Sequence, residues 1–368
     1  MKRDPALYDY LPYNAQRPVI KWPNGARVAF WVAPNVEFYE LNPPRNPARA
    51  PWARPAPDIL NYSYRDYGNR TGFWRMLDVM KRCNMRGSVS LNVAMCEHHP
   101  EVIKACADNG WEFYSHGTYN TRYLMGMSEA EERAVIQDSI DTIKKHTGQK
   151  LDGWLAPALT YTPNTMDLVA EMGLNYVCDL FHDDQPGPVK VKQGRLTSVP
   201  YSLEMNDTIV YNVNLVQPRR YADILKRQFD RLYEEGEHSG TVMCIPLHPY
   251  LVGQPYRMAA FEEALSYNTS HDKVWLATGR EIAHHFNKHY HAEFTAAAIS
   301  VLSRPRLLRA VMRSVIQRCG VAEGRDFCPD RVRGIPPGAH LVARSLLMEP
   351  IADFLRKPTP THCLADDK

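Results

Sequence analysis

The chain has 368 residues, 44% of them hydrophobic and 10% aromatic, and a formal net charge of +3. This length can bury a large core, and it allows one barrel-sized domain with an appendage or two ordinary domains. The near-neutral charge gives no footprint for nucleic acid, and no stretch approaches the ~20 apolar residues of a membrane span.

The cysteines and the first residues indicate the compartment. None of the eight cysteines stands at CxxC spacing from another, which argues against a zinc ribbon or a disulfide scaffold and suits reduced thiols. The opening stretch, MKRDPALYDYLPYN, contains no apolar targeting segment. We therefore expect a cytoplasmic protein that contacts neither nucleic acid nor a membrane.

The first predicted strand covers residues 27–33 (RVAFWVA), and Glu37 follows it after a short PNV segment. Aromatic and β-branched residues of this kind form buried strands. A carboxylate just after a buried strand is a candidate catalytic group, although a solvated loop acid is the more frequent explanation at such a position.

A proline-rich segment comes next, residues 41–57, with six prolines. It is too long for an ordinary connection in a compact domain, which favours either disorder or a lid. The tyrosines in the following NYSYRDYGNRTG favour a packed, binding-related loop. Asp66 and Tyr67 lie there and could reach a substrate, although an ordinary loop ion pair is the commoner role for such an acid.

The rest of the chain alternates between helical and strand patterns, which predicts a parallel sheet. Seven or eight such units predict an α/β fold in the form of a (β/α) barrel of about seven parallel strands, with a doubly wound open sheet as the alternative. No phosphate-binding glycine loop follows any strand. Helices are predicted over residues 73–84, 100–109, 129–147 (with Ser128 as the cap), 164–172, 221–235 and 258–266 and from residue 280, and strands over 88–95, 111–115, 151–155, 176–178, 208–212, 240–246 and 274–277.

Two histidines stand at the ends of predicted strands. His116 follows the strand 111–115, and Gly117 allows the chain to turn away there. His248 ends the apolar run MCIPL. A lone histidine at a strand end is often only structural, but two such ends can face one cavity, because ligands in α/β folds collect at the carboxyl ends of strands.

Several stretches in this order resemble the polysaccharide deacetylase superfamily, whose nodulation-deacetylase homology fold is a distorted (β/α) barrel. The likeness is closer to its allantoinase-like branch, which includes enzymes that hydrolyse cyclic imides. The stretches that carry it are Asn35–Glu37, DYGNRTGFWR at 66–75, YSHGTYN at 114–120, GWLAPALTYTPNT and AEMGLNY within 153–176, SVPYSLEMND at 198–207, LHPYLVGQPYR at 247–257 and VWLATGREIAHHF at 274–286.

The departures from the sugar deacetylases concern the metal. Those enzymes carry an Asp-Asp pair after the first strand and an H-x-x-x-H pair. Here Phe38 follows Glu37, and Asn120 stands four residues after His116. An amide oxygen is a poor substitute for a strong ligand on catalytic zinc. The resemblance therefore implies that no metal is required, or that a weakly held divalent ion, zinc being a candidate, is bound by His116 and Asn120.

The resemblance also implies an activity, the hydrolysis of a non-peptide C–N bond in a small cyclic amide or imide. Glu37 would activate water, His248 would protonate the departing nitrogen, and His116 would position the water and the carbonyl. The alternatives are a metal-dependent N-deacetylase of an amino-sugar polymer and an inactive barrel that acts as a binding protein. The candidate substrate-binding residues are Asp66, Tyr67, Trp154, the Asp183 and Asp184 pair, and Asn206.

The likeness assigns residues 1–290 to the barrel domain and leaves 291–368 as an extension of unknown role. This extension holds twelve Lys and Arg against eight Asp and Glu, and AAAISVLSRPRLLRAVMRSVIQRC predicts a basic amphipathic helix followed by irregular chain. The extension could pack on the barrel, mediate oligomer contacts or touch an acidic surface, and a membrane-surface helix is a weaker alternative. The resemblance favours a homo-oligomer.

Overall fold

A computed structural model describes residues 6–13, 17–44 and 56–300 of the chain. Residues 291–300 of the predicted C-terminal extension are helical, and the rest of that extension lies outside the described residues, as does most of the proline-rich segment. The boundary at residue 290 therefore stays a prediction.

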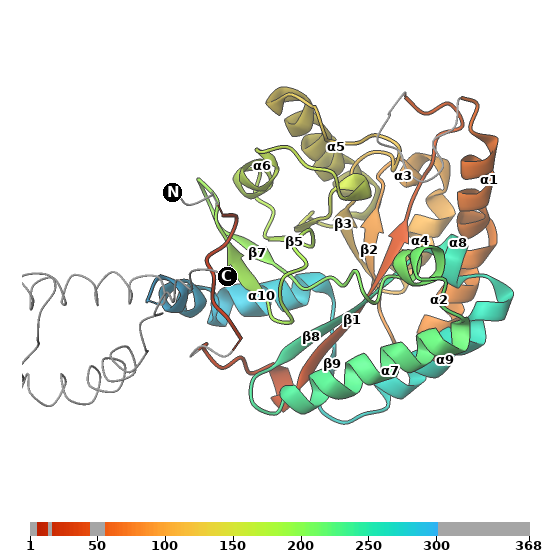
Figure 1. The fold of residues 1–368 in the computed structure, drawn as a ribbon. Coiled ribbons are helices and arrows are strands. Elements are labelled where there is room, and N and C mark those ends of the chain that lie inside the picture. Colours follow the sequence, from red (N-terminus) through yellow and green to blue (C-terminus); the bar gives the residue numbers. More distant parts are fainter. Residues whose placement is uncertain (1–5, 14–16, 45–55, 301–368) are drawn as a thin grey trace, which may run out of the picture. The chain divides into compact units, whose positions relative to one another are not determined.

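One curled, mostly parallel sheet with helices around it forms a half-barrel (Figure 1). Within the described residues the strand order is β6-β7-β5-β4-β3-β2-β1-β8, and β9 also pairs with β1. Only the pairing of β6 with β7 is antiparallel. The predicted fold class is confirmed. The strands are β1 (Val28–Val36), β2 (Ser88–Leu91), β3 (Glu112–Ser115), β4 (Gly153–Trp154), β5 (Tyr176–Val177), β6 (Gly187–Val189), β7 (Leu196–Ser198), β8 (Thr241–Leu247) and β9 (Val274–Leu276).

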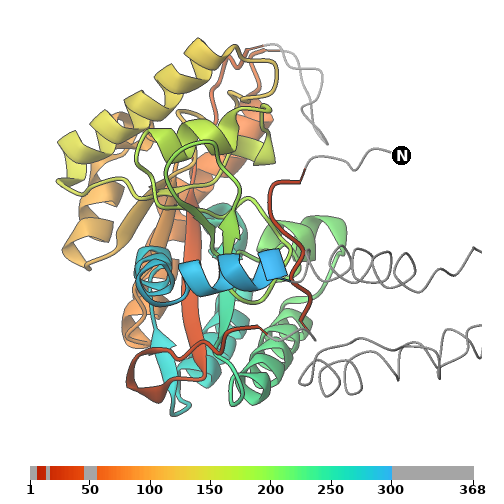
Figure 2. The same cartoon turned by 90° about the vertical axis from the view of Figure 1, so that its left-hand side faces the viewer.

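The helices lie on the outside of the curled sheet (Figures 1 and 2). They are α1 (Ile59–Tyr67), α2 (Phe73–Arg82), α3 (Met95–His98), α4 (Pro100–Asp108), α5 (Glu129–Thr147), α6 (Thr165–Glu171), α7 (Pro218–Glu235), α8 (Pro249–Val252), α9 (Pro255–Thr269) and α10 (Gly279–His289), with the short helices η1 (Pro23–Gly25), η2 (Gly68–Gly72), η3 (Pro157–Leu159) and η4 (Ile209–Val213). The predicted cap of α5 is confirmed, because the Ser128 hydroxyl accepts from the Glu131 N–H and the Glu131 carboxylate accepts from the Ser128 N–H.

Strand β1 pairs with three other strands, and all nine of its residues are buried. It pairs with β8 over Val28 to Pro34, with β9 over Val28 to Phe30 and with β2 at Asn35 and Val36. A continuous apolar run is typical of a parallel strand covered on both faces. The run VAFWVAPNV meets this demand, and it places the residue that follows, Glu37, at the carboxyl rim of the sheet.

Three sequence-based expectations were wrong. The segment 208–212, rich in β-branched residues, is not a strand: residues 209–212 belong to the π-helix η4, which is closed by the i→i−5 bond from the Asn214 N–H to the Ile209 carbonyl (2.8 Å). The tyrosine-rich loop is helical instead, as α1 and η2. Its start is fixed by Asp58, whose carboxylate accepts from the Asn61 N–H. Strands β6 and β7 arise in residues 181–200, for which the sequence patterns predicted no strand.

No helix in the described part of the chain is long and apolar enough to cross a membrane. The five cysteines within the described ranges are free thiols. A homo-oligomeric state, a cytoplasmic location and the absence of nucleic-acid binding stay predictions.

Candidate active site

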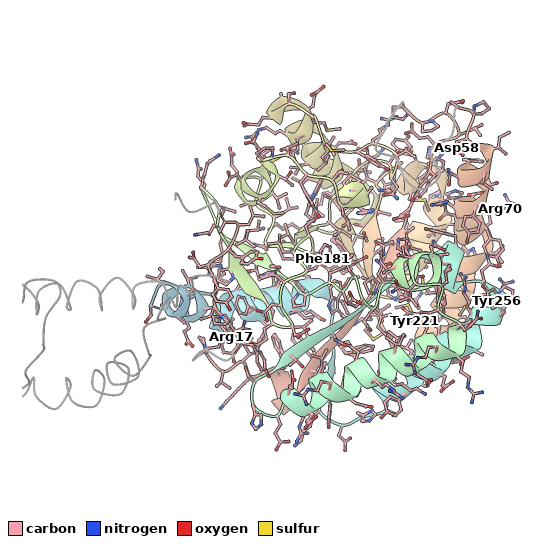
Figure 3. All side chains as sticks on the ribbon, viewed as in Figure 1. Arg17, Asp58, Arg70, Phe181, Tyr221 and Tyr256 are labelled. Atoms are coloured by element: carbon pink, nitrogen blue, oxygen red, sulfur yellow. The ribbon has the colours of Figure 1, made fainter. Side chains whose placement is uncertain are left out.

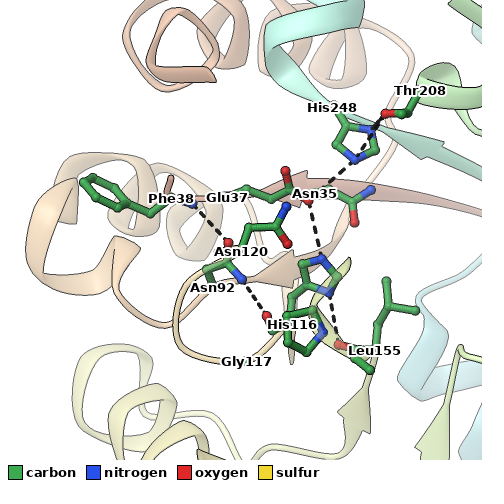
Figure 4. A network of polar contacts seen from close by, with 12 residues as sticks. Asn35, Glu37, Phe38, Asn92, His116, Gly117, Asn120, Leu155, Thr208 and His248 are labelled. Atoms are coloured by element: carbon green, nitrogen blue, oxygen red, sulfur yellow. Dashed lines mark hydrogen bonds and ion pairs between the residues drawn. The ribbon is translucent and has the colours of Figure 1, made fainter. Parts of the chain in front are cut away.

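The three predicted catalytic side chains meet at the carboxyl rim of the half-barrel. Glu37 follows β1, His116 follows β3 and His248 follows β8, and these strands run parallel, so their carboxyl ends open at one rim. The Oε1 atom of Glu37 lies 3.4 Å from His116 Nε2 and 3.5 Å from His248 Nε2 (Figure 4). All three residues are at most 8% exposed. The structure therefore brings one carboxylate between two imidazoles.

The Glu37 carboxylate is ionised in this setting. Burial alone would raise its pKa, but the charge of His248 and hydrogen bonds from both imidazoles outweigh burial and lower the pKa to about 2. Its second oxygen, Oε2, has no hydrogen-bond partner among the described residues. Glu37 thus carries a negative charge at neutral pH and keeps one oxygen available for a ligand.

His248 is held by Asp207, a fully buried acid. The Asp207 carboxylate accepts from His248 Nδ1 (2.7 Å) and from the His248 backbone N–H (2.8 Å). Thr208 Oγ1 lies 2.9 Å from the same ring nitrogen. Burial would lower the pKa of His248, but Glu37 and Asp207 raise it to about 10. His248 is therefore an imidazolium at neutral pH, with Nε2 directed at Glu37.

His116 is oriented by the backbone around it. Its Nδ1 lies 3.0 Å from the Leu155 carbonyl oxygen, and because a carbonyl only accepts, Nδ1 carries the proton and Nε2 faces Glu37. Gly117 has a φ of +70°, and a Cβ there would lie 2.9 Å from Pro157, so this turn requires glycine. The prediction that Gly117 allows the chain to turn away after His116 is confirmed.

Two further buried groups hold this rim. Asn92 donates to the His116 carbonyl (2.5 Å) and accepts from the Phe38 N–H (3.1 Å), so it ties the ends of β1 and β3 together (Figure 4). Asp179 follows β5 and accepts from the Ala156 N–H (2.7 Å), next to the turn that orients His116. Burial raises the pKa of Asp179 to about 7.

A cavity of about 580 Å³ opens over Glu37. Its lining combines polar groups with a set of aliphatic side chains. The polar and aromatic lining residues are Asn35, Glu37, Tyr39, Asn61, Arg65, His116, Asn120, Tyr123, Tyr201, Asn206, Thr208, Asn212, His248 and Tyr250, and the apolar ones are Leu155, Ala158, Leu159, Leu203, Ile209 and Val213. This is the size of a small-molecule site.

Of the predicted substrate-binding residues, only Asn206 lines this cavity, and its amide donates to the Tyr201 hydroxyl (3.3 Å). Trp154 is fully buried in the core. Asp66 lies 3.4 Å from the His99 imidazole, and the Tyr67 hydroxyl accepts from Arg75 (2.6 Å); neither lines the cavity.

The Asp183 and Asp184 pair also lies outside the cavity lining. Both acids line two other hollows of the protein. Asp183 forms an ion pair with Arg17 (2.7 Å). Helix α1 begins after Asp58 and carries Arg65, which lines the cavity. Figure 3 shows Arg17 well separated from Asp58. The structure therefore does not bring these two acids together with the predicted catalytic residues.

Sequence reasoning missed three residues at this rim. Asp207 stood in a quoted stretch, SLEMND, directly after Asn206, and an acid there was the available signal. Tyr39 and Arg65 also line the cavity, with the Arg65 guanidinium carbon 4.5 Å from the centre of the Tyr39 ring. No short-range pattern could have placed Arg65 there, because the contact joins segments on either side of the proline-rich region.

The fold is a half-barrel of the deacetylase type, and comparisons with known proteins show the family. The polysaccharide deacetylase family profile matches residues 58–177. A Schizosaccharomyces pombe protein named "Putative polysaccharide deacetylase" is 30% identical over 313 residues, 73% of this chain and 94% of that protein. The chain therefore belongs to the polysaccharide deacetylase family, whose members are hydrolases that act on C–N bonds.

Two crystal structures are similar over most of the barrel. A "probable Polysaccharide deacetylase" from Pseudomonas aeruginosa PAO1 is 32% identical, with a TM-score of 0.67, over 76% of this chain and 97% of that one. Puue allantoinase is 27% identical, with a TM-score of 0.68, over 79% of this chain and 99% of that one. The similar structures thus include one named as a polysaccharide deacetylase and one named as an allantoinase.

The family implies a divalent metal, and such an ion needs three or more strong ligands to bind tightly. Glu37 and His116 supply one carboxylate and one imidazole, and the third position is the amide of Asn120. Within the described ranges, no three His, Cys, Asp or Glu side chains form a group that could hold a metal ion. The donor set therefore differs from that of a tightly bound catalytic ion, and a weakly held ion stays a prediction.

Proposed function

We propose that this protein hydrolyses a C–N bond in a small cyclic amide or imide. The observation that carries the proposal is the buried Glu37 carboxylate between two imidazoles, one of which is paired with Asp207. Hydrolysis of an amide needs a base for water and an acid for the departing nitrogen. An ionised carboxylate and an imidazolium at one rim meet both needs at neutral pH.

The proposed reaction begins with a water molecule between Glu37 and His116. Oε2 of Glu37 has no hydrogen-bond partner among the described residues, so it can accept a hydrogen bond from this water, and the His116 imidazole, with Nε2 3.4 Å from Oε1, lies beside it. As its oxygen attacks the carbonyl carbon, Glu37 takes a water proton. His248 then gives its Nε2 proton to the ring nitrogen as the C–N bond breaks, which leaves an open-chain carboxylic acid.

Several observations favour a ring amide over a sugar polymer. The strong-ligand set that a metal-dependent sugar deacetylase needs is incomplete at Asn120. The cavity is of small-molecule size, and aliphatic side chains such as Leu159, Ile209 and Val213 form part of its lining, whereas a sugar chain would require polar groups along a groove. The similarity to Puue allantoinase spans nearly all of that protein.

The second candidate is a carbohydrate N-deacetylase. It is favoured by the names of the S. pombe and P. aeruginosa relatives, both described as polysaccharide deacetylases. A third candidate, an inactive barrel that only binds, does not explain why Asp207 holds His248 in the orientation of a proton donor.

Turnover of a substrate panel tests these candidates. The panel contains allantoin, succinimide, a hydantoin and an N-acetylglucosamine oligomer, each with and without chelator, alongside elemental analysis of the protein. We expect ring opening that persists in chelator. Chelator-sensitive release of acetate from the oligomer would instead establish the deacetylase, and binding of a ring without turnover would support the inactive barrel.

A further inference from the structure

Asn120 occupies the position where the resembled sugar deacetylases have the second histidine of their H-x-x-x-H pair. It is 6% exposed and lines the cavity, and Figure 4 shows its amide beside Glu37 and His116. Its backbone N–H donates to the Phe38 carbonyl (3.1 Å), which fixes the residue against the end of β1. The amide is therefore part of the rim that holds the proposed reacting groups.

The two ends of this amide differ in their bonding. The nitrogen, Nδ2, donates to the Tyr39 hydroxyl. The oxygen, Oδ1, is buried and has no hydrogen-bond donor among the described residues. A buried acceptor without a partner costs about 1–3 kcal/mol, so such an atom in a cavity calls for a donor on the ligand.

The orientation of the amide is set by the residues behind it. The Arg65 guanidinium carbon lies 4.5 Å from the centre of the Tyr39 ring and 4.9 Å from that of Tyr250. Arg65 also donates to Asn61 Oδ1 (2.8 Å). This packing holds Tyr39, and because the Tyr39 oxygen accepts from the amide nitrogen, the amide oxygen of Asn120 is turned away from Tyr39.

We infer that Asn120 Oδ1 accepts the N–H of the ring amide or imide and so selects substrates that carry this hydrogen. The inference rests on the proposed function and deepens it. An amide N–H lies in the plane of the ring, whereas the lone pair that develops on the nitrogen as the C–N bond breaks projects out of that plane. Asn120 can thus hold the nitrogen in the plane while His248 delivers the proton from one face.

The replacement of histidine by asparagine follows from this role. An amide oxygen is a neutral acceptor of hydrogen bonds, and it needs no metal for this role. Unlike an imidazole nitrogen, it is not converted to a donor by protonation. An imidazole at this position would accept only through an unprotonated nitrogen. The same position can therefore serve a metal in a deacetylase and a substrate N–H in a hydrolase of rings.

Paired substrates test the inference directly. Succinimide has the N–H and N-methylsuccinimide lacks it. We expect the Asn120→Ala change to lower kcat/KM for succinimide about 10- to 100-fold and to leave N-methylsuccinimide within about threefold, because the lost hydrogen bond exists only with the first substrate. The Asn120→Asp change keeps an acceptor and should keep most of the preference for succinimide. The matched control is Asn109→Ala, an amide truncation at the end of α4, which should change neither value.

The outcomes separate this inference from the proposed function. A wild-type protein that opens both imides equally well, or an Asn120→Ala protein that loses both activities equally, would overturn the role of Asn120 and leave ring hydrolysis standing. A folded wild-type protein that opens neither imide nor any other ring of the panel would overturn the proposed function and this inference with it. Thermal melting of each variant verifies that it is folded.

Discussion

The two ends of the half-barrel each bury a carboxylate, and they treat it in opposite ways. At the carboxyl rim, Glu37 has one oxygen without a partner among the described residues and faces a cavity. At the amino end, Glu112 accepts from Ser88 (2.8 Å), from the Tyr176 hydroxyl (2.7 Å) and from the Arg280 N–H (2.9 Å), and it lines none of the cavities described above.

The electrostatics of the two carboxyls differ in the same sense. Burial raises the pKa of Glu112, and Arg280 with the surrounding hydrogen bonds only partly opposes it. At Glu37 the imidazoles prevail over burial and hold the pKa at about 2. The comparison of Glu37 with Glu112 shows that burial alone does not identify a functional acid. A saturated set of hydrogen bonds indicates a structural role, and an unsaturated oxygen in a cavity indicates chemistry.

The largest expected effect separates these two acids by activity. The Glu37→Gln change removes the base, and kcat for ring opening should fall about 10³-fold or more, because positioned acid–base groups contribute factors of this order. Steady-state kinetics on the best substrate of the panel would measure it.

The control for this change is Glu101→Gln on the exposed surface of α4, where activity should stay the same. Ligand binding by the Glu37→Gln protein should persist, as measured by calorimetry with succinimide. A Glu37→Gln protein with wild-type kcat would show that Glu37 is not the base. The two ends of the half-barrel would then not differ in the function of their buried acids.

A smaller effect is expected at the partner of the acid. The Asp207→Asn change removes one of the two charges that raise the pKa of His248 to about 10. The acid works only while it is protonated, so wild-type activity should fall as pH rises through about 10, and in the variant this fall should move to lower pH. At neutral pH we expect kcat to drop about 10²-fold.

The measurement is kcat/KM against pH for both proteins. The Asp183→Asn change serves as the control, because Asp183 pairs with Arg17 away from the cavity, and its profile should match that of the wild type. An alkaline limb that stays in place in the Asp207→Asn protein would mean that another group supplies the proton.

Much of the fold could be predicted because its signals are local. The helix 129–147 was predicted to the residue, since its cap and its periodicity both lie within the segment. The strand ends that carry Glu37, His116 and His248 were visible as apolar runs followed by a polar residue. The segment 208–212 failed because β-branched residues suggested a strand where the tertiary context builds a π-helix.

The rest of the site depends on contacts between distant parts of the chain. The bond between Asp207 and His248 joins two segments that sequence periodicity treats independently, and the same is true of Arg65 beside Tyr39. Tryptophan is a residue type that can stack on a ligand, but Trp154 lies in the core. Sequence patterns indicate which residues end a strand, whereas only the three-dimensional arrangement tells which of them share a cavity.

At the amino end the effect should appear in stability instead of activity. The Glu112→Gln change removes the charge that faces Arg280 and weakens a saturated network, so the free energy of unfolding should fall by about 1–3 kcal/mol. Urea unfolding would measure this loss, and kcat of the folded protein should remain within about twofold. A Glu112→Gln protein of normal stability and much reduced kcat would show that the two ends are not functionally distinct.

The smallest effect is expected at a position that belongs to neither end. Ser128 caps α5 through its hydroxyl and the Glu131 backbone N–H. The Ser128→Ala change should lower the free energy of unfolding by about 1 kcal/mol and leave kcat unchanged, because the cap satisfies a helix terminus and touches no group of the cavity. Urea midpoints for Ser128→Ala and for Ser270→Ala, an exposed serine after α9, would give the comparison. A loss of activity in the Ser128→Ala protein would mean that α5 couples to the rim, since Ser139 on this helix lies 2.9 Å from the hydroxyl of Ser115, the residue before His116.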